Sequence, residues 1–430
     1  RILIKAGVEI LAEKRKGSPV ILAGGSAITM NPEPVAEAVD ICFLGDGENL
    51  PGHLLDAFDA ATDYEDFLDR LDGIPGVYLP GRTRPVFDGD TIEGFSGSLP
   101  TLSVTDPIEH PAHTVILAED TVFRDMFLLE IARGCPYRCR FCTAREIYSP
   151  FRPVALENMG PYLDMAASSG KKLGLVSTSL NNHPQSGQLF VEINKRGLMV
   201  APPSLRLGRI TGDLTDILRE SKVTGVTLAP ETGSDELRYA AGKDISNETI
   251  LADVRSLVSS GIRDIKLYFM VGIPQETESD IDAVIDLVKR IRQSFIQVSR
   301  GNKRLGRLSV SINTMVPKPH TPYERSGMIS AADARARIRK IVRALKRESN
   351  VEVSFEGPKW AYLQALFARG DRRVLDVIIE MARREPDSWQ EVLRQWPRNP
   401  DYYALRQRSE SEILPWSFYS LHKPCAEFKR

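Results

Sequence analysis

Three of the five cysteines in this chain lie within eight residues, at Cys135, Cys139 and Cys142. Cysteine thiolates are the usual ligands of iron–sulfur clusters, and a full set has four of them. Because no fourth cysteine stands nearby, a cluster held here would keep one iron with an open coordination position, as catalytic metal sites do. Gly134 and Pro136 favour a loop that curls around such a cluster. The sequence therefore predicts a cluster whose open iron binds a substrate or a cofactor.

A zinc site is the alternative that three neighbouring thiols leave open. Structural zinc has four protein ligands, and the remaining candidates, Cys42, Cys425 and six histidines, are distant in the sequence. An odd number of cysteines in a chain of 430 residues argues against a disulfide framework. We therefore expect a reducing compartment, the cytoplasm.

Composition narrows the range of partners. The formal net charge of −1 gives no overall basic field that would attract nucleic acid. No apolar run is long enough to span a bilayer. We therefore expect neither a nucleic acid nor a membrane as partner. The basic helix predicted at residues 331–347 is consistent with a solvated outer face, and phosphate or RNA binding is the alternative.

Short apolar segments alternate with amphipathic ones from about residue 125 to residue 347. The apolar segments are typical of parallel strands buried on both faces, and six βα units predict a partial (βα)6 TIM-like barrel. The predicted strands are Phe127–Ile131, Leu173–Ser177, Ser204–Leu207, Gly225–Ala229, Asp264–Val271 and Leu308–Met315. Sites in such folds lie at the carboxyl ends of the strands, and the three cysteines follow the first strand.

The chain on either side of the barrel predicts two further parts. A strand at Ser18–Ala23, a helix at Pro34–Val39 and a strand at Asp40–Leu44 predict a truncated Rossmann-like domain. We expect this α/β domain and its linker at residues 1–110, the barrel at 111–350, and a helical and then irregular segment at 351–430. Residues 73–110 are expected to be a linker with little regular structure. The chain begins at Arg1, in what reads as the middle of a helix, so we expect that residues precede it.

The pattern Cys-x-x-x-Cys-x-aromatic-Cys, with Phe141 as the aromatic residue, resembles the signature of the radical S-adenosylmethionine (SAM) superfamily. The resemblance implies a [4Fe–4S] cluster on the three cysteines, with the open iron binding the amino and carboxylate groups of SAM. It implies reductive cleavage of SAM to a 5′-deoxyadenosyl radical that takes hydrogen from a substrate. The electron would come from a donor such as flavodoxin or ferredoxin. The protein would supply ligation, orientation and exclusion of water.

The resemblance also implies SAM contacts at the strand ends. Ser177 and Thr178 end the second strand, where the family often contacts the SAM amino group, although the more common Gly-Gly-Glu pattern is missing here. Glu231 is expected to accept hydrogen bonds from SAM; the alternative is an acid placed at a helix N-terminus by the dipole. The expected cofactor-binding residues are Phe141, Ser177, Thr178, Ser204, Arg206, Glu231, Val271 and Gly272.

Two glycine turns near the start of the chain resemble part of the cobalamin-binding domain of B12-type radical SAM proteins. They are Gly24-Gly25-Ser26 and Gly45-Asp46-Gly47-Glu48. The first would let backbone approach a cobalamin tail, although the usual lower-ligand signature, Asp-x-His-x-x-Gly, is absent. A methylthiotransferase normally holds a second cluster on three upstream cysteines, and only Cys42 lies upstream. The sequence leaves cobalamin-assisted methyl transfer or cyclisation of an unknown substrate, with a non-catalytic zinc- or RNA-binding module as the alternative.

Overall fold

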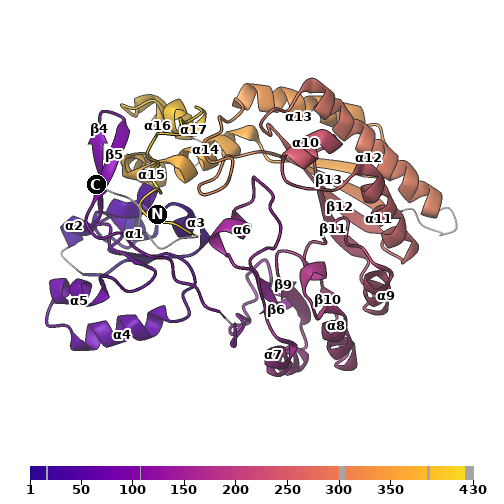
Figure 1. The fold of residues 1–430 in the computed structure, drawn as a ribbon, viewed down its shortest axis with the longest axis horizontal. Coiled ribbons are helices and arrows are strands. Elements are labelled where there is room, and N and C mark those ends of the chain that lie inside the picture. Colours follow the sequence, from indigo (N-terminus) through magenta and orange to yellow (C-terminus); the bar gives the residue numbers. More distant parts are fainter. Residues whose placement is uncertain (16–17, 107, 300–305, 385–387, 422–430) are drawn as a thin grey trace.

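The computed structural model describes residues 1–15, 18–106, 108–299, 306–384 and 388–421. It confirms the predicted α/β class: parallel strands alternate with helices through the middle of the chain (Figure 1). None of the helices in these ranges is long and apolar enough to cross a membrane.

Two parallel sheets form the middle of the molecule, in the orders β10-β9-β6 and β11-β12-β13-β14. A single parallel bridge between Leu205 and Leu228 joins them. The strands are β6 (Met126–Glu130), β9 (Lys172–Val176), β10 (Val200–Ala201), β11 (Gly225–Glu231), β12 (Asp264–Val271), β13 (Arg307–Thr314) and β14 (Val351–Phe355). The connecting helices are α7 (Leu156–Ser169), α8 (Ser186–Lys195), α9 (Gly212–Glu220), α10 (Asp235–Ala240), α11 (Asn247–Ser259), α12 (Glu278–Ser299) and α13 (Ala331–Leu345). Apart from α10, these helices pack their apolar faces with the strands into one large hydrophobic core, whereas Leu237 of α10 belongs to a smaller cluster.

Five of the six predicted strands form within two residues of the predicted bounds, and β12 matches at both ends. The prediction at Ser204–Leu207 is wrong, because only Leu205 is paired there and the strand lies at Val200–Ala201. Pro202 and Pro203 lack the backbone N–H that would continue the ladder. The prediction of helix from Val351 onward is also wrong at its start, because Val351–Phe355 is β14, parallel to β13.

The N-terminal part holds a sheet of its own, in the order β1-β2-β3. The strands are β1 (Leu22–Ala23), β2 (Ile41–Phe43) and β3 (Val77–Tyr78), with β3 antiparallel to β2. The helices are α1 (Ile2–Lys5), α2 (Ala12–Arg15), α3 (Ser26–Met30), the 3₁₀ helix η1 (Glu33–Ala38), α4 (Leu50–Ala60) and α5 (Tyr64–Leu71). Residues 73–110 are not the expected linker, because they hold β3 and the hairpin of β4 (Arg84–Asp88) and β5 (Thr91–Ser96).

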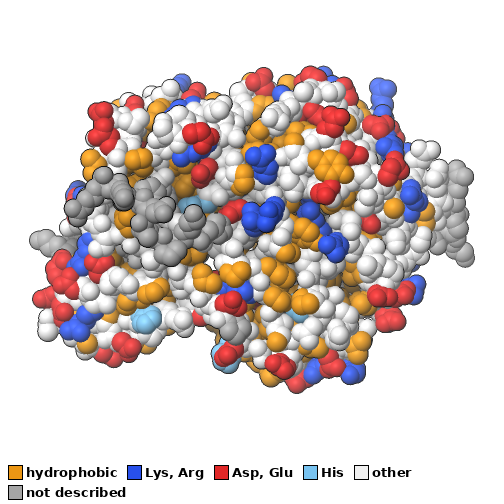
Figure 2. All heavy atoms as spheres, in the orientation of Figure 1, with side chains coloured by type: hydrophobic (Ala, Val, Ile, Leu, Met, Phe, Trp, Pro, Cys, Tyr) orange, Lys and Arg blue, Asp and Glu red, His pale blue; other side chains and the backbone are white. Residues whose placement is uncertain are grey.

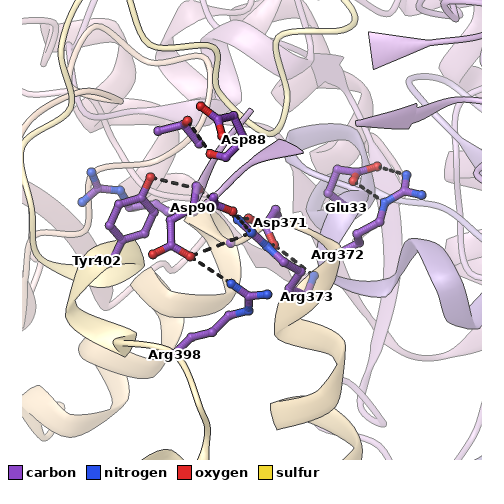
Figure 3. A network of polar contacts seen from close by, with 12 residues as sticks. Glu33, Asp88, Asp90, Asp371, Arg372, Arg373, Arg398 and Tyr402 are labelled. Carbon is purple, nitrogen blue, oxygen red and sulfur yellow. Dashed lines mark hydrogen bonds and ion pairs between the residues drawn. The ribbon is translucent and has the colours of Figure 1, made fainter. Parts of the chain in front are cut away.

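The C-terminal segment lies against the N-terminal part rather than apart from it. Its helices are α14 (Pro358–Arg369), η3 (Arg372–Val374), α15 (Leu375–Arg383), α16 (Trp389–Gln395) and α17 (Pro400–Ala404). Figure 3 shows the polar contacts that join the two: Arg372 pairs with the buried Glu33 through two bonds of 2.9 Å, and Arg398 pairs with Asp90 at 2.9 Å. The ring of Phe418 packs 4.8 Å from that of Tyr78. Residues far apart in the sequence thus share one core.

Candidate functional site

The three cysteines lie on the connection between two short antiparallel strands, β7 (Ala132–Arg133) and β8 (Arg152–Pro153). The connection also contains α6 (Thr143–Ile147), which begins directly after Cys142. We call residues 132–153 the cysteine hairpin. Gly134 has a φ of 82°, and a Cβ there would overlap the carbonyl oxygen of Tyr148. Only glycine fits this turn without strain.

Replacing Gly134 with alanine is therefore expected to cost about 1–3 kcal/mol and to disturb the cysteines that follow it. Gly160→Ala is the matched control, because Gly160 lies inside α7 with no atom within 4 Å of a Cβ. Alanine there should leave stability unchanged or raise it by about 0.5–1 kcal/mol. Thermal unfolding and bound iron after reconstitution measure both effects. Equal stability and equal iron in the two variants would contradict this role of Gly134.

The thiols are free of disulfides, with Cys139 buried and Cys135 and Cys142 half-buried. The N–H of Cys142 donates to the carbonyl of Cys139 at 3.1 Å, which closes the turn between these two ligands. Burial raises the pKa of the Cys142 thiol, against two backbone N–H groups of α6 that lower it. Arg206 Nη1 lies 3.5 Å from Cys139 Sγ. Burial prevails over these backbone donors, so the Cys142 thiol has to give up its proton when it binds a metal.

Cys42 does not belong to this group. It lies on β2 in an apolar cluster, where burial and the charge of Glu33 raise its pKa far above the ordinary value of a thiol. Cys42 is therefore a core thiol of the N-terminal part, on a strand of another sheet than the cysteine hairpin. Within the part of the chain that the structure describes, no three His, Cys, Asp or Glu side chains are arranged to hold a single metal ion. The three thiols nevertheless suit a cluster, in which each ligand binds a different iron.

The base of the cysteine hairpin is fixed by ion pairs to the N-terminal part. Asp46, which is 5% exposed, pairs with Arg133 at 2.9 Å and with Arg152. Arg133 also pairs with Glu48 and Glu130, each at 2.7 Å. Burial alone would raise the pKa of Asp46, but the bonds from Arg152 and Thr105 and the charge of Arg133 lower it overall. The second glycine turn therefore holds β7 and β8, the two strands that flank the cysteines, a role that sequence reasoning missed.

The residues that end β9 lie against the cysteine hairpin. Thr178 Oγ1 donates to the carbonyl of Gly134 at 2.8 Å, whereas Ser177 Oγ donates to the carbonyl of Ser179 at 3.2 Å. Arg206 stacks on the ring of Tyr137 with its Cζ 4.0 Å from the centroid, and Ser204 is exposed. The structure thus brings Thr178 and Arg206 to the cysteines.

Glu231 ends β11 with a φ of 70°, and it lies before α10 rather than at the N-terminus of that helix. Its carboxylate accepts a hydrogen bond from the buried Lys243 at 2.8 Å. The same ammonium group also donates to the carbonyl of Ala229. Lys243 was not a predicted site residue. A backbone strained in this way is typical of functional positions.

Phe141, the aromatic residue of the signature, and the end of β12 share a small apolar cluster. Phe141 packs against a cluster that includes Ile273 and Tyr323. Val271 is fully buried. Gly272 has a φ of 84°, and a Cβ there would overlap Ile329. Its N–H donates to Glu276 at 2.7 Å.

Polar atoms without partners lie near the same strand ends. Among the described residues, Asn182 Nδ2, Thr232 Oγ1 and Thr314 Oγ1 are buried and make no hydrogen bond. Asn182 lies in the connection after β9, Thr232 directly follows β11, and Thr314 is the last residue of β13. Buried polar groups are normally hydrogen-bonded. Three thiols and unsatisfied polar atoms at the strand ends therefore fit a cluster and a polar cofactor.

Comparison with known proteins decides the family. The family model described as "Radical SAM superfamily" matches residues 129–288, which include the cysteine hairpin. A second model, "Radical SAM proteins, N-terminal", matches residues 1–80. The uncharacterised protein MJ0966 of Methanocaldococcus jannaschii is 30% identical over 374 residues, which cover 85% of this chain and 75% of that protein. This chain belongs to the radical SAM superfamily. It is an enzyme of that superfamily, with a [4Fe–4S] cluster and SAM as cofactors.

Other radical SAM proteins are less similar. The ribosomal protein uS12 methylthiotransferase RimO of Moorella thermoacetica is 25% identical over 338 residues, or 74% of this chain and 75% of that protein. Among solved structures, the radical SAM methyltransferase TsrM of Kitasatospora setae with cobalamin and a [4Fe–4S] cluster bound matches with a TM-score of 0.52 at 16% identity. The cobalamin-dependent enzyme OxsB matches with a TM-score of 0.51 at 15% identity. The matches cover 71% and 79% of this chain but only 58% and 50% of those chains. At this identity they show a shared fold.

Proposed function

We propose that this radical SAM enzyme holds its cluster on Cys135, Cys139 and Cys142 and binds SAM at the open iron. The observation that carries the proposal is the cysteine hairpin, in which three free thiols follow β6 without a fourth described ligand beside them. The cluster supplies one electron when reduced, and bound SAM supplies the hydrogen-abstracting radical. The proposal does not specify the substrate.

The sheets support a division of the chain for this function. We propose that β6, β9, β10 and β11 to β13 form the partial (βα)6 barrel within residues 111–350, and that β14, at the start of residues 351–430, extends its sheet. A single apolar core runs from Ile108 to Leu345 and supports these limits. We propose residues 1–110 as a Rossmann-like domain and 351–430 as a segment that fastens the barrel to it. A cluster with an open iron needs a reducing compartment, for which the cytoplasm is our proposal.

Each proposed cofactor residue has a task that its place supports. Arg206 and Thr178 steady the cysteine hairpin by direct contact with Cys139 and with the carbonyl of Gly134. Glu231, held by Lys243, would accept hydrogen bonds from SAM. Phe141, Val271 and Gly272 would shield the adenosine part from water. Ser177, which is half-buried just after β9, would contact the SAM amino group, and Ser204 would bind SAM from an exposed position.

Anaerobic reconstitution tests this function directly. The purified chain should bind about four irons and, with dithionite and SAM, release 5′-deoxyadenosine. Protein purified in air and washed with a chelator serves as the control and should release none. Stoichiometric zinc with no iron–sulfur absorbance would favour the non-catalytic zinc- or RNA-binding module instead.

Cobalamin-assisted methyl transfer or cyclisation is the second candidate function. The shared fold with TsrM and OxsB favours it, together with the turn at Gly25, where no atom lies within 4 Å of a Cβ and backbone is open to a ligand. The turn at Gly45 does not fit a corrinoid, because a Cβ there would overlap the carbonyl of Ser103 and Asp46 is committed to arginines. Incubation with hydroxocobalamin and gel filtration should leave a corrinoid spectrum on the protein. Loss of that spectrum from a folded chain would reject this candidate.

A further inference from the structure

Two arginines flank the middle ligand of the cysteine hairpin, and both are exposed. Arg138 precedes Cys139 and Arg140 follows it. Their backbone is held against the turn after α10: the N–H of Arg140 donates to the carbonyl of Ala241 at 2.9 Å, and Gly242 contacts the carbonyl of Arg138 so closely that a Cβ would not fit. The two guanidinium groups are therefore presented from a fixed backbone beside a cluster ligand.

The charges of this hairpin are unevenly compensated. At its base, Arg133 and Arg152 pair with Asp46, Glu48 and Glu130. Among the described residues, neither Arg138 nor Arg140 has a carboxylate within ion-pair distance. Arg140 lies over the ring of Tyr323 with its Cζ 5.4 Å from the centroid and donates to the carbonyl of Ala240 at 3.4 Å.

A third exposed arginine belongs to the neighbouring loop. Asn181 Nδ2 donates to the carbonyls of both Arg206 and Arg209, at 2.9 and 3.0 Å, so Arg209 is tied to the loop that contacts Cys139. Arg209 also lacks a carboxylate partner in the described part of the chain. Figure 2 shows Lys and Arg side chains gathered near the centre of this face, where Figure 1 has the loop before α6 and the region below α10. We call Arg138, Arg140 and Arg209 the arginine lip.

We propose that the arginine lip is the docking surface for an electron-transfer protein with an acidic face around its flavin or iron–sulfur centre. This inference rests on the proposed function. In the step served by docking, the donor loses one electron and the cluster gains it, and no bond forms or breaks. On a protein with a net charge of −1, the unpaired positive charge of the arginine lip would attract such a donor to the surface beside Cys139.

The position of the lip favours a donor over an anionic substrate. Electron transfer weakens steeply with distance, so a donor must dock where it nearly touches the cluster, and Arg138 and Arg140 are the neighbours of Cys139 in the chain. The proposed SAM residues Thr178 and Glu231 are only partly exposed, whereas the arginines lie at the surface. An acidic donor can therefore reach the cluster loop without entering the SAM site.

The test compares two reductants on the reconstituted holoenzyme. Arg138→Glu should lower the rate of 5′-deoxyadenosine formation about tenfold when reduced flavodoxin or reduced ferredoxin is the donor, and should leave the rate with dithionite within about twofold. The dissociation constant for the carrier should rise by a similar factor and lose much of its salt dependence. Arg138→Lys should keep the carrier-supported rate and the dissociation constant for the carrier close to those of the wild type. Arg339→Glu on the exposed side of α13 is the matched control and should change neither.

Several outcomes would overturn the inference. Equal rates and affinities of Arg138→Glu and wild type with both carriers would do so. A wild-type enzyme that responds to dithionite but to neither carrier would do so as well. An equal loss with dithionite would place Arg138 in cluster or substrate binding, as an acidic or RNA substrate requires. Failure of the proposed function itself looks different, because the wild type would then form no 5′-deoxyadenosine even with dithionite.

Discussion

Replacing Cys135 with alanine should abolish SAM cleavage while leaving the fold intact. The side chain is half-buried on a loop, so its loss opens little core, but it removes one of three thiolates. A cluster with only two protein ligands should be lost on desalting. We expect bound iron to fall well below the level of the wild type and 5′-deoxyadenosine formation to fall at least about a hundredfold. Iron analysis and product chromatography measure the two effects.

Cys42→Ala is the matched control for this loss. Cys42 is buried in the N-terminal core and holds its proton, so its replacement should cost about 1 kcal/mol of stability and leave iron binding unchanged. If Cys135→Ala retains a cluster that cleaves SAM, the ligand assignment is wrong. The same holds if Cys42→Ala loses iron to the same extent.

Replacing Asp46 with asparagine should have the second large effect, although Asp46 carries no chemistry of its own. The change removes the carboxylate that Arg133 and Arg152 share. Arg133 keeps its pairs with Glu48 and Glu130, whereas Arg152, whose side chain is 3% exposed, has no other ion pair among the described residues. Breaking a buried pair in this way costs about 3–5 kcal/mol. Because both arginines stand on the strands that carry the cysteine hairpin, we also expect less bound iron and weaker SAM binding. Chemical unfolding, iron analysis and equilibrium binding of SAM to the anaerobic protein measure these changes.

Glu48→Gln provides the matched comparison for Asp46. Glu48 pairs with the same Arg133 at 2.7 Å but has a side chain that is 34% exposed. Exposed pairs contribute about 0–1 kcal/mol, so this change should be small in both stability and iron content. An Asp46→Asn variant no worse than Glu48→Gln would show that the N-terminal part does not position the cysteine hairpin.

Local sequence patterns predicted those elements whose structure depends on neighbouring residues in the chain. Gly134 and Pro136 predicted a loop around the cysteines, and the apolar run from Asp264 to Val271 predicted β12 at both ends. The start of α11 is another locally determined feature, because the side chain of its N-cap residue Ser246 accepts a hydrogen bond from the N–H of Thr249. β14 was missed, although Val351, Val353 and Phe355 alternate with polar residues in the period of a strand.

The positioning of the site depends on contacts that no local pattern contains. Asp46 and Arg152 are 106 residues apart, and Glu33 and Arg372 are 339 residues apart. The turn around Asp46 was noted only for its resemblance to part of a cobalamin-binding domain, whereas in the folded chain its carboxylate pairs with arginines of the cysteine hairpin. The support of Glu231 by Lys243 likewise depends on how the chain folds back after α10. Pairing between distant charges becomes visible only in the folded molecule.

The most direct test of the account is magnetic resonance of the reduced cluster in the presence of SAM labelled with ¹³C at the carboxylate and ¹⁵N at the amino group. If Cys135, Cys139 and Cys142 leave one iron uncapped, both labels should couple to the cluster's electron spin, and the coupling should disappear in the absence of labelled SAM. A reduced cluster in the complete chain that shows no coupling to either label, because a fourth protein ligand occupies that iron, would contradict the account.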